Sequence, residues 1–516
     1  MKKNLILLFV LSWVAGMPLK AQSQMSLTVD SVGTLATLLP DSLRYCIEEL
    51  KISGTLNASD FKVLQLMANR TKPKQAGHRL LRRLDLTDVV VAESKTLLKG
   101  KSDAMPSGQF AGCKSLEYVA LPSTATEVSK SCFSGCSGLR EVVIPTGILT
   151  IGDNAFANCP ALPDITWPEA LTAVGSHAFD GCKSFTQVAL PETLTSLDSY
   201  AFANCHSLTA VSIKGNLTKL PNSLFAGCEQ LQEVEIPQTI TTIGSSAFKG
   251  CSSLTALALP PSVGEVGNSA FEGCMNLSDI QLPSVLKSIG RAAFLDCKNL
   301  SDIQLPASLT AIGSHAFEGC ASLKSIVVPN LVKQLGSDAF ENCTSLDSVV
   351  ITGFIPKLEG SVFRFCHSLR TITLPLSVRS IGDNCFQDCS SLERITLPVS
   401  LSSIGDNAFE NCVSLTSIEV PAPCTSIGSS AFRECMSLQQ ATLPAALNKI
   451  GGNAFAKCAS LREVVVGAPQ PPKITHSTFK GVVLAHCNFY IPKGTRARYA
   501  ADKSWAKIPH VMEVTK

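Results

Sequence analysis

The chain has 516 residues, with 44 lysines and arginines against 41 acidic residues, and 45% of its residues are hydrophobic. Three of the lysines, Lys2, Lys3 and Lys20, lie in the first 21 residues, so the rest of the chain is formally neutral. A neutral chain is not expected to bind nucleic acid, because the phosphate backbone selects proteins with a basic surface.

Residues 1–21 have the features of a secretory signal peptide. Lys2 and Lys3 precede an apolar run from Leu5 to Val14, which is too short to span a bilayer. No cysteine follows this run before Cys46, so we expect no lipid anchor there. No later segment approaches the roughly 18 apolar residues of a membrane helix. The sequence therefore predicts export, to the cell surface, outer membrane, medium or periplasm, without a membrane span.

Residues 22–109 predict an N-terminal cap made of longer β-α coils. The apolar pattern Ile47-x-x-Leu50-x-Ile52 returns as Leu81-x-x-Leu84-x-Leu86, and Asn57 is placed to cap a helix between these strands. Such a cap covers the open edge of a solenoid core. The stretch after the helix is basic, which fits a solvated loop or contact with an anionic surface such as lipopolysaccharide. Its basic residues are Arg70, Lys72, Lys74, Arg79, Arg82 and Arg83.

Residues 110–466 contain sixteen repeats of 23 residues, without insertion or deletion. The pair Phe-x-x-Cys marks each repeat, from Phe110 and Cys113 to Phe455 and Cys458. Written from the cysteine, one unit reads C-x-S-L-x-x-I-x-L-P-x-x-L-x-x-I-G-x-x-A-F-x-G. A period of about 20 to 29 residues carrying L-x-x-I-x-L is typical of a solenoid with one coil per unit. In such a solenoid each added repeat extends one continuous core. We therefore expect one elongated domain, although the length of the chain alone would predict several.

The repeat that begins at Cys274 illustrates the coil we expect. Ile280 and Leu282 point inward on a strand, and Pro283 ends the strand because it cannot donate a backbone hydrogen bond. A second, shorter strand is possible before Gly290, which suits a tight corner with positive φ. The spacing of Ala293, Phe294 and Cys297 then fits one face of a short helical or 3₁₀ turn.

The phenylalanines and cysteines of successive coils are expected to form a buried ladder. Its central members are Phe271, Cys274, Phe294, Cys297, Phe317 and Cys320. A cysteine demanded once per coil indicates a small buried side chain, and parallel Cβ vectors oppose disulfides between neighbours, so we expect free thiols. Histidines beside the ladder, such as His206 and His367, occupy variable turn positions. We therefore expect no metal, no cofactor and no catalytic residues.

Thirteen of the sixteen repeats end the strand with proline, and the exceptions are Lys214, Thr352 and Gly467. The first two of these repeats, which we call the variant coils, also replace the glycine of I-G and the alanine of the consensus. The replacements are Pro221 and Leu224 in the first variant coil, and Glu359 and Val362 in the second. Coordinated changes of this kind predict a locally different corner and a wider coil.

Residues 467–516 predict a C-terminal cap. Pro469-Gln470-Pro471-Pro472 ends the array, and the segment from Phe489 to Pro492 supplies a last strand. We expect a short helix from Thr495 to Asp502 and an edge strand from Val511 to Val514. Trp505 is expected to fill the open end of the core.

The segments I-x-L-P, I-G-x-x-A-F and G-C-x-S-L resemble the BspA-like (Treponema-type) leucine-rich repeats of bacterial surface proteins, and the resemblance covers all sixteen repeats. The segment from Phe489 to Trp505 is similar to a closing module of such proteins from Gram-negative anaerobes. The resemblance implies a right-handed superhelix with a parallel β-sheet on the concave face. It places short 3₁₀ or helical turns and short second strands on the convex side. It also implies adhesion to host proteins or other bacteria, and it carries no catalytic motif.

The outward positions of the predicted strands are the candidate binding surface. They form two columns, of which the first runs Tyr118, Glu141, Asp164, Gln187, Ala210, Glu233, Ala256, Asp279, Asp302 and Ser325. The predicted ligand-binding residues are Glu233, Glu235, Asp279, Gln281, Asp302 and Gln304. This mildly acidic face, in which Arg394 is the only basic residue, suits a host extracellular or bacterial surface protein, or a glycan. We expect the protein to bind it as a monomer.

Two alternatives to a noncatalytic binding protein follow from the same residues. Parallel β-helix polysaccharide-active enzymes have coils of this length, although they need three strands per coil and a cluster of exposed charged residues. The neighbouring Asp279 and Asp302 could hold Ca²⁺ or share a proton. A structural surface-layer protein would instead self-assemble without a ligand.

Overall fold

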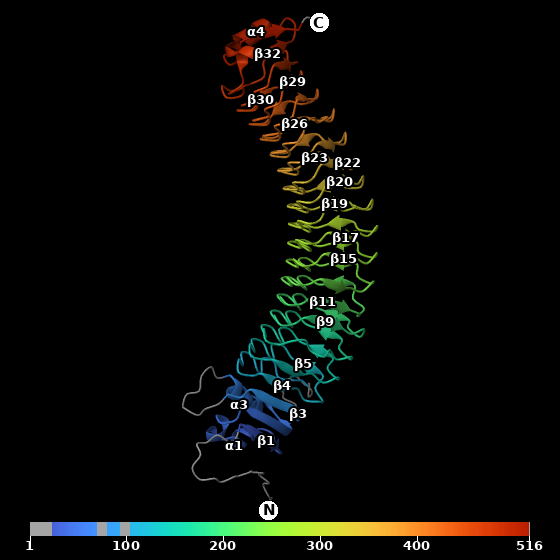
Figure 1. Ribbon diagram of the computed structural model, residues 1–516, viewed down its shortest axis with the longest axis vertical. Coiled ribbons are helices and arrows are strands. Elements are labelled where there is room, and N and C mark those ends of the chain that lie inside the picture. Colours follow the sequence, from blue (N-terminus) through green and yellow to red (C-terminus); the bar gives the residue numbers. More distant parts are fainter. Residues whose placement is uncertain (1–22, 70–79, 93–103, 515–516) are drawn as a thin grey trace, which may run out of the picture.

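The computed structural model describes residues 23–69, 80–92 and 104–514. The expected signal peptide at residues 1–21 and the basic residues Arg70, Lys72, Lys74 and Arg79 lie outside the described residues. The described chain forms one curved solenoid with its two ends at opposite poles (Figure 1). It consists of stacked parallel strands with little helix, so the predicted repeat solenoid is confirmed.

A regular coil contributes one longer strand of three or four residues and one second strand of two residues. The longer strands of the array are β4 (Tyr118–Ala120), β6 (Glu141–Val143), β9 (Gln187–Leu190), β11 (Ala210–Ile213), β13 (Glu233–Glu235), β15 (Ala256–Ala258), β17 (Asp279–Gln281), β20 (Ser325–Val328), β22 (Ser348–Ile351), β24 (Thr371–Thr373), β27 (Ser417–Glu419), β29 (Gln440–Leu443) and β31 (Glu463–Val466). Paired strands keep a constant offset of one repeat, so each residue stacks on its equivalent in the next coil.

The second strands are more regular than the longer ones. They are β5 (Glu127–Val128), β7 (Thr150–Ile151), β8 (Ala173–Val174), β10 (Ser196–Leu197), β12 (Lys219–Leu220), β14 (Thr242–Ile243), β16 (Glu265–Val266), β18 (Ser288–Ile289), β19 (Ala311–Ile312), β21 (Gln334–Leu335), β23 (Lys357–Leu358), β25 (Ser380–Ile381), β26 (Ser403–Ile404), β28 (Ser426–Ile427) and β30 (Lys449–Ile450). In each of them the first residue faces outward and the second is buried.

The N-terminal residues form longer coils, as their spacing predicts. Strands β1 (Gln24–Val29), β2 (Glu49–Leu56) and β3 (Arg83–Val91) pair in parallel and continue into β4 and β6. Between β2 and β3 lies helix α3 (Ala58–Ala68), which Asn57 caps by accepting from the Asp60 amide, while the Asp60 side chain accepts from the Asn57 amide. Two single-turn helices, α1 (Leu35–Leu38) and α2 (Asp41–Arg44), connect β1 to β2. Strand β1 was not predicted.

The C-terminal residues close the other end. Strand β32 (Asn488–Ile491) pairs with β31 and β33 (Val511–Glu513) pairs with β32. The predicted helix is α4 (Arg496–Ala501), and two 3₁₀ helices, η1 (Leu484–His486) and η2 (Trp505–Lys507), flank it. Trp505 is buried against Phe489 and Tyr499, and its Nε1 donates to the Pro472 carbonyl at 2.8 Å. In the described ranges, every helix is too short or too polar to cross a bilayer.

The ladder of phenylalanines and cysteines lies at the centre of the array. The rings from Phe110 to Phe479 stack coil upon coil, with centroids 5.1 to 6.1 Å apart. Each ladder cysteine from Cys136 to Cys458 donates its S–H to the phenylalanine carbonyl oxygen of the preceding coil, at 3.0 to 3.3 Å. The six central ladder residues are fully buried. The described cysteines form no disulfides.

The segment between the second strand and the next cysteine differs from the prediction. In the coil of Phe294, both Ala292 and Asp296 have positive φ, at 53° and 57°. A right-handed helix does not include left-handed residues, so the chain forms turns there instead of the expected helical or 3₁₀ turn. The backbone amide of Phe271 donates to the Ala293 carbonyl of the next coil at 2.8 Å, and equivalent bonds recur along the array. These bonds form a third ladder beside the two sets of strands.

The role predicted for Gly290 was wrong. Gly290 does not have a positive φ, and a Cβ added to it would lie 2.6 Å from the backbone nitrogen of Asn268. The glycine is therefore needed because adjacent coils approach closely at this corner. The left-handed conformation belongs to the residue two positions later, which is a serine, asparagine or another small polar residue in most coils.

The two variant coils interrupt the sheet of second strands. This sheet is continuous from β5 to β10, from β12 to β21 and from β23 to β30, and each interruption falls at a variant coil. The widest spacing in the phenylalanine stack, 6.1 Å, separates Phe202 from Phe225 beside the first of them. The altered corners predicted from the coordinated substitutions therefore coincide with changes in how neighbouring coils pair.

Candidate binding surface

The outward side chains of the longer strands form the surface that we call the first sheet face. The strand register places Ala210 beside Glu233 and Ser212 beside Glu235, and further along it places Ala256 beside Asp279. Because pairing is in register, equivalent side chains form two columns that run along the solenoid. Each column repeats at about the 4.8 Å spacing of neighbouring strands.

The six predicted ligand-binding residues are all exposed, but they do not form one group. Glu233 and Glu235 lie on β13, at the edge of a three-stranded sheet. Asp279 and Gln281 lie on β17, two coils away. The coil between them presents two alanines, Ala256 and Ala258, so the two acidic segments are separated by an uncharged step of the surface.

Asp302 and Gln304 were expected on a strand, and this was wrong. The structure assigns no longer strand to the coil that contains them, nor to the coils of Asp164 and Arg394, which keep only their second strands β19, β8 and β26. The Gln304 side chain turns back and donates to Asp302 Oδ1 at 3.0 Å. The sheet of longer strands is divided into shorter sheets at these three coils and also between β13 and β15, so the predicted continuous columns are interrupted.

Two depressions adjoin Glu235. One, of about 340 Å³, lies over β9, β11 and β13 and is lined by Gln187, Ser212, Glu233 and Glu235. The other, of about 440 Å³, lies at the corner of the first variant coil beside Lys214 and Gly215. Ser212 Oγ donates to Glu235 Oε2 at 2.7 Å, which orients the carboxylate between the depressions. The sequence marks this coil as a variant one, but nothing in the sequence connects it to the acidic residues.

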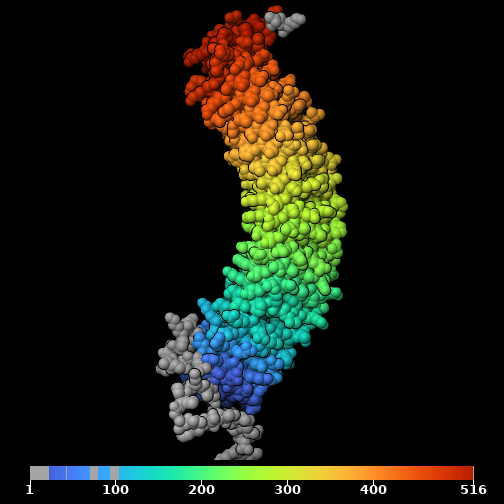
Figure 2. All heavy atoms as spheres, in the orientation of Figure 1, coloured from blue at the N-terminus to red at the C-terminus, as the bar shows by residue number. Residues whose placement is uncertain are grey.

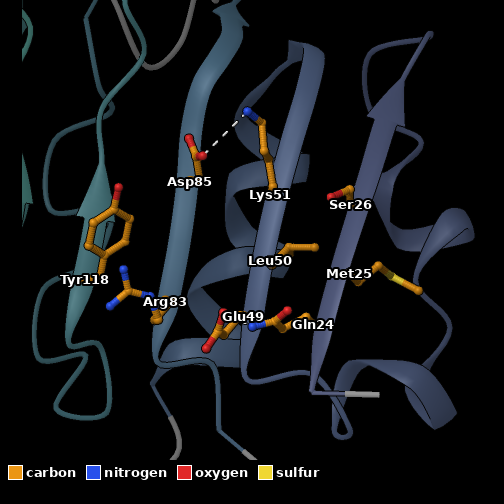
Figure 3. A pocket seen from close by; sticks show the side chains of 9 residues that line it. All are labelled: Gln24, Met25, Ser26, Glu49, Leu50, Lys51, Arg83, Asp85 and Tyr118. Carbon is orange, nitrogen blue, oxygen red and sulfur yellow. Dashed lines mark hydrogen bonds and ion pairs between the residues drawn. The ribbon is translucent and has the colours of Figure 1, made fainter. Parts of the chain in front are cut away.

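A further hollow on the same face lies at the N-terminal end, over β1 to β4 (Figure 3). It has a volume of about 320 Å³, and its outward side chains are Gln24, Ser26, Glu49, Lys51, Arg83, Asp85 and Tyr118. The Arg83 guanidinium lies 4.0 Å from the centroid of the Tyr118 ring. Lys51 pairs with Asp85 at 3.7 Å and with Asp88 at 2.9 Å.

The N-terminal hollow lies outside the columns predicted from the sequence. Lys51 and Arg83 extend the columns with basic residues, whereas Arg394 was the only basic residue in the predicted set. The hollow was not predicted because the strand at Gln24–Val29 was not predicted. Its alternation of exposed and half-buried residues is short and has no equivalent 23 residues later. The described part of the basic stretch also pairs locally, since Arg82 contacts Glu117 at 2.5 Å.

Two histidines away from this face make local contacts. His177 Nδ1 lies 2.8 Å from Asp180 and its ring stacks on Tyr200, and His315 Nδ1 lies 2.6 Å from Glu318. Burial raises the pKa of the Cys274 thiol to about 12, so this thiol stays protonated at neutral pH. Within the described ranges, no group of three or more histidine, cysteine or acidic residues is arranged to hold a metal ion.

Comparison with known proteins gives the family of the chain. Residues 103–232, 218–347 and 356–484 match the BspA type leucine rich repeat region. A leucine-rich repeat protein from Bacteroides ovatus is 28% identical over 76% of this chain and 87% of its own, with a TM-score of 0.52. A leucine rich cell surface protein from Faecalibacterium prausnitzii is 25% identical over 61% of this chain and 82% of its own, with a TM-score of 0.36. No curated protein matches the chain. With more than half of its length matched, the chain belongs to the BspA-type leucine-rich-repeat family.

Proposed function

We propose that this protein is an exported, noncatalytic binding protein, and that its first sheet face binds a protein or glycan on a host or bacterial surface. Proteins of the BspA type are typically noncatalytic and typically secreted or held at the cell surface, which supports both parts of the proposal. The exported state rests on residues 1–21 of the sequence. The viewed face of the molecule in Figure 2 is a long continuous surface, which suits an extended partner.

The observation that carries the proposal is the exposure of acidic side chains at fixed register on stacked strands. Glu233, Glu235 and Asp279 are exposed and project from parallel strands of the stacked coils. A partner with several basic groups contacts more than one coil at once, so individually weak ion pairs add up through multivalency. Binding should therefore weaken as the salt concentration rises.

The test is a variant that removes four carboxylates from this face: Glu233→Ser, Glu235→Ser, Asp279→Ser and Asp302→Ser. We expect it to lose adhesion to a panel of extracellular-matrix proteins and whole bacterial cells, while its circular dichroism and thermal midpoint stay unchanged. A matched control removes four exposed carboxylates elsewhere: Glu169, Asp198, Glu229 and Glu265. Parent-like adhesion by the first variant, with adhesion lost instead on changing Arg82 and Arg83, would move the binding site to the N-terminal end.

A further inference from the structure

One corner of the array carries bulky apolar side chains that are exposed to solvent. The corner comprises the two positions after the proline of the repeat, or after the residue that replaces this proline. In four consecutive coils it presents Leu331, Phe354, Leu376 and Val399, which are 48%, 64%, 72% and 71% exposed. We call these four residues the apolar ridge. The second of these coils is the second variant coil, in which Thr352 replaces proline.

The other coils of the same chain serve as an internal comparison. At the same two positions they carry serine, threonine, glycine, alanine, proline, asparagine, glutamine or glutamate, and the one exception is an isolated valine, Val285. The ridge is therefore not a requirement of the fold, because twelve coils form the corner without it. Contiguous exposed apolar residues of this kind mark interaction surfaces. Val327, on β20 of the first ridge coil, is also exposed and extends the apolar surface.

Basic side chains border the ridge on the side of the second strands. Lys333 and Arg379 occupy the fourth position after the strand end, where most other coils carry threonine or serine. Neither forms an ion pair with another described residue. Lys357 lies one position further along the intervening coil, and its Nζ is 2.5 Å from Glu359. Lys333 and Lys357 also line a hollow of about 330 Å³. The outward column nearest the ridge on the side of the longer strands is uncharged, with Val327, Val350, Thr373 and Thr396, and Arg394 lies in the next column.

The spacing of the ridge favours a helix over a strand as the occupant. Neighbouring coils lie about 4.8 Å apart, whereas successive side chains on one face of an extended strand lie about 6.6 to 6.8 Å apart. An α-helix repeats its apolar stripe every turn, at about 5.4 Å, so a helix lying along the solenoid stays close to register over four coils. A second copy of this chain related by a two-fold axis would place the basic border against the uncharged side or against its own equivalent, and in either case those cations would lack acidic partners.

We propose that the apolar ridge docks an amphipathic helix of a partner protein, with acidic residues of that helix facing Lys333, Lys357 and Arg379. The apolar stripe of the helix covers Leu331, Phe354, Leu376 and Val399, and the carboxylates set its direction and lateral position. This surface is separate from the first sheet face, and its use does not depend on the ligand proposed there.

The experiment uses the full chain and a fluorescein-labelled helical peptide with a leucine stripe of helical period and glutamates along one flank. We expect saturable binding by fluorescence anisotropy, weakened about tenfold or more by Leu331→Ser, Phe354→Ser, Leu376→Ser and Val399→Ser together. Val285→Ser is the matched control and should leave binding unchanged. The triple variant Lys333→Glu, Lys357→Glu and Arg379→Glu should reject this peptide and bind one with lysines on the flank. The quadruple variant of the first sheet face should bind the peptide like the parent.

Other outcomes overturn the proposal. Binding that survives loss of the ridge, or that ignores the sign of the peptide flank, shows that the peptide does not dock there as proposed. No binding up to the solubility limit of the peptide also contradicts a helix site. Sedimentation with phosphatidylglycerol vesicles that depends on Phe354, without peptide binding, assigns the ridge to a lipid surface. A concentration-dependent dimer that Phe354→Ser abolishes assigns it to a second copy of this chain.

Discussion

At the scale of single residues, the recurring cysteine has a specific hydrogen-bonding role. The carbonyl oxygen of Phe271 accepts from the Cys274 amide at 3.0 Å and from the Cys297 thiol of the next coil at 3.2 Å. Cysteine suits this position because its side chain is small and apolar enough for a packed core, and its S–H group is a weak hydrogen-bond donor. The repeat therefore uses its thiols as structural donors.

The burial of these thiols predicts a loss of stability at alkaline pH. The folded-state pKa of Cys274 is raised by burial to about 12, whereas an exposed thiol titrates near about 8.5. Between these values the unfolded chain binds fewer protons than the folded chain, so stability is fully present below about pH 8.5 and falls as pH rises further. Urea midpoints measured from neutral to alkaline pH should show this decline, and Cys274→Ala should reduce its slope. A flat profile would contradict buried, protonated thiols.

The stacked phenylalanines predict large local costs on truncation. Phe294 is fully buried between Phe271 and Phe317, with centroids 5.2 and 5.3 Å away. Phe294→Ala should cost about 3 to 5 kcal/mol, because it opens a cavity next to both neighbouring rings. Phe354→Ala is the control, since its exposed side chain should change stability by only about 0.5 kcal/mol. Chemical denaturation of both variants provides the comparison, and a cost below about 1 kcal/mol for Phe294→Ala would mean that the stack contributes little.

At the scale of elements, the residue after the longer strand decides how far the strand pairs. Lys214, Thr352 and Gly467, which replace proline, each donate their backbone amide to the preceding coil, at 3.2, 3.0 and 2.8 Å. Proline cannot make this bond, and it ends the ladder in the other coils. In the variant coils the extra bond draws the following glycine close to the preceding coil. That approach moves the corner and interrupts the sheet of second strands.

A pair of glycine substitutions tests this account of the variant coils. A Cβ at Gly353 would lie 2.4 Å from the Val332 carbonyl oxygen, whereas one at Gly264 would have no neighbour within 4 Å. Gly353→Ala should therefore destabilise the protein by about 1 to 3 kcal/mol through overpacking. Gly264→Ala should be neutral or stabilising by up to about 1 kcal/mol, because it restricts the unfolded chain. Equal thermal midpoints for the two variants would show that the close approach is not needed.

At the scale of the whole molecule, the fold is an elongated body in which each coil contacts its neighbours. Sixteen coils at about 4.8 Å give an array roughly 75 Å long along its axis, before the caps are added. A globular chain of this length would have a radius of gyration of about 24 Å. Small-angle scattering should give a clearly larger value and a distance distribution with a long tail. A value near that of a compact sphere would contradict the solenoid.

The sequence alone determined the coil and its core. The strict 23-residue period predicts stacked coils, and the alternation within Asp279–Gln281 predicts which side chains face inward, because both depend on local periodicity. The phenylalanine and cysteine positions follow for the same reason, since a residue that recurs once per coil meets its own equivalent. The caps were also predictable in outline, from Asn57 and from the apolar pattern around Phe489.

Pairing between coils was decided by the tertiary structure. The segments Asn276–Pro283 and Asn299–Pro306 have the same eight residues, yet the first contains strand β17 and the second contains no strand. Identical local sequences cannot account for the difference, so it arises from how each coil sits against its neighbours. Gly290 is a second example, because a larger side chain there would collide with the backbone of the adjacent coil. The N-terminal hollow likewise needs four strands from separate parts of the chain, because hydrogen bonding in a parallel sheet is a relation between segments and not a property of one.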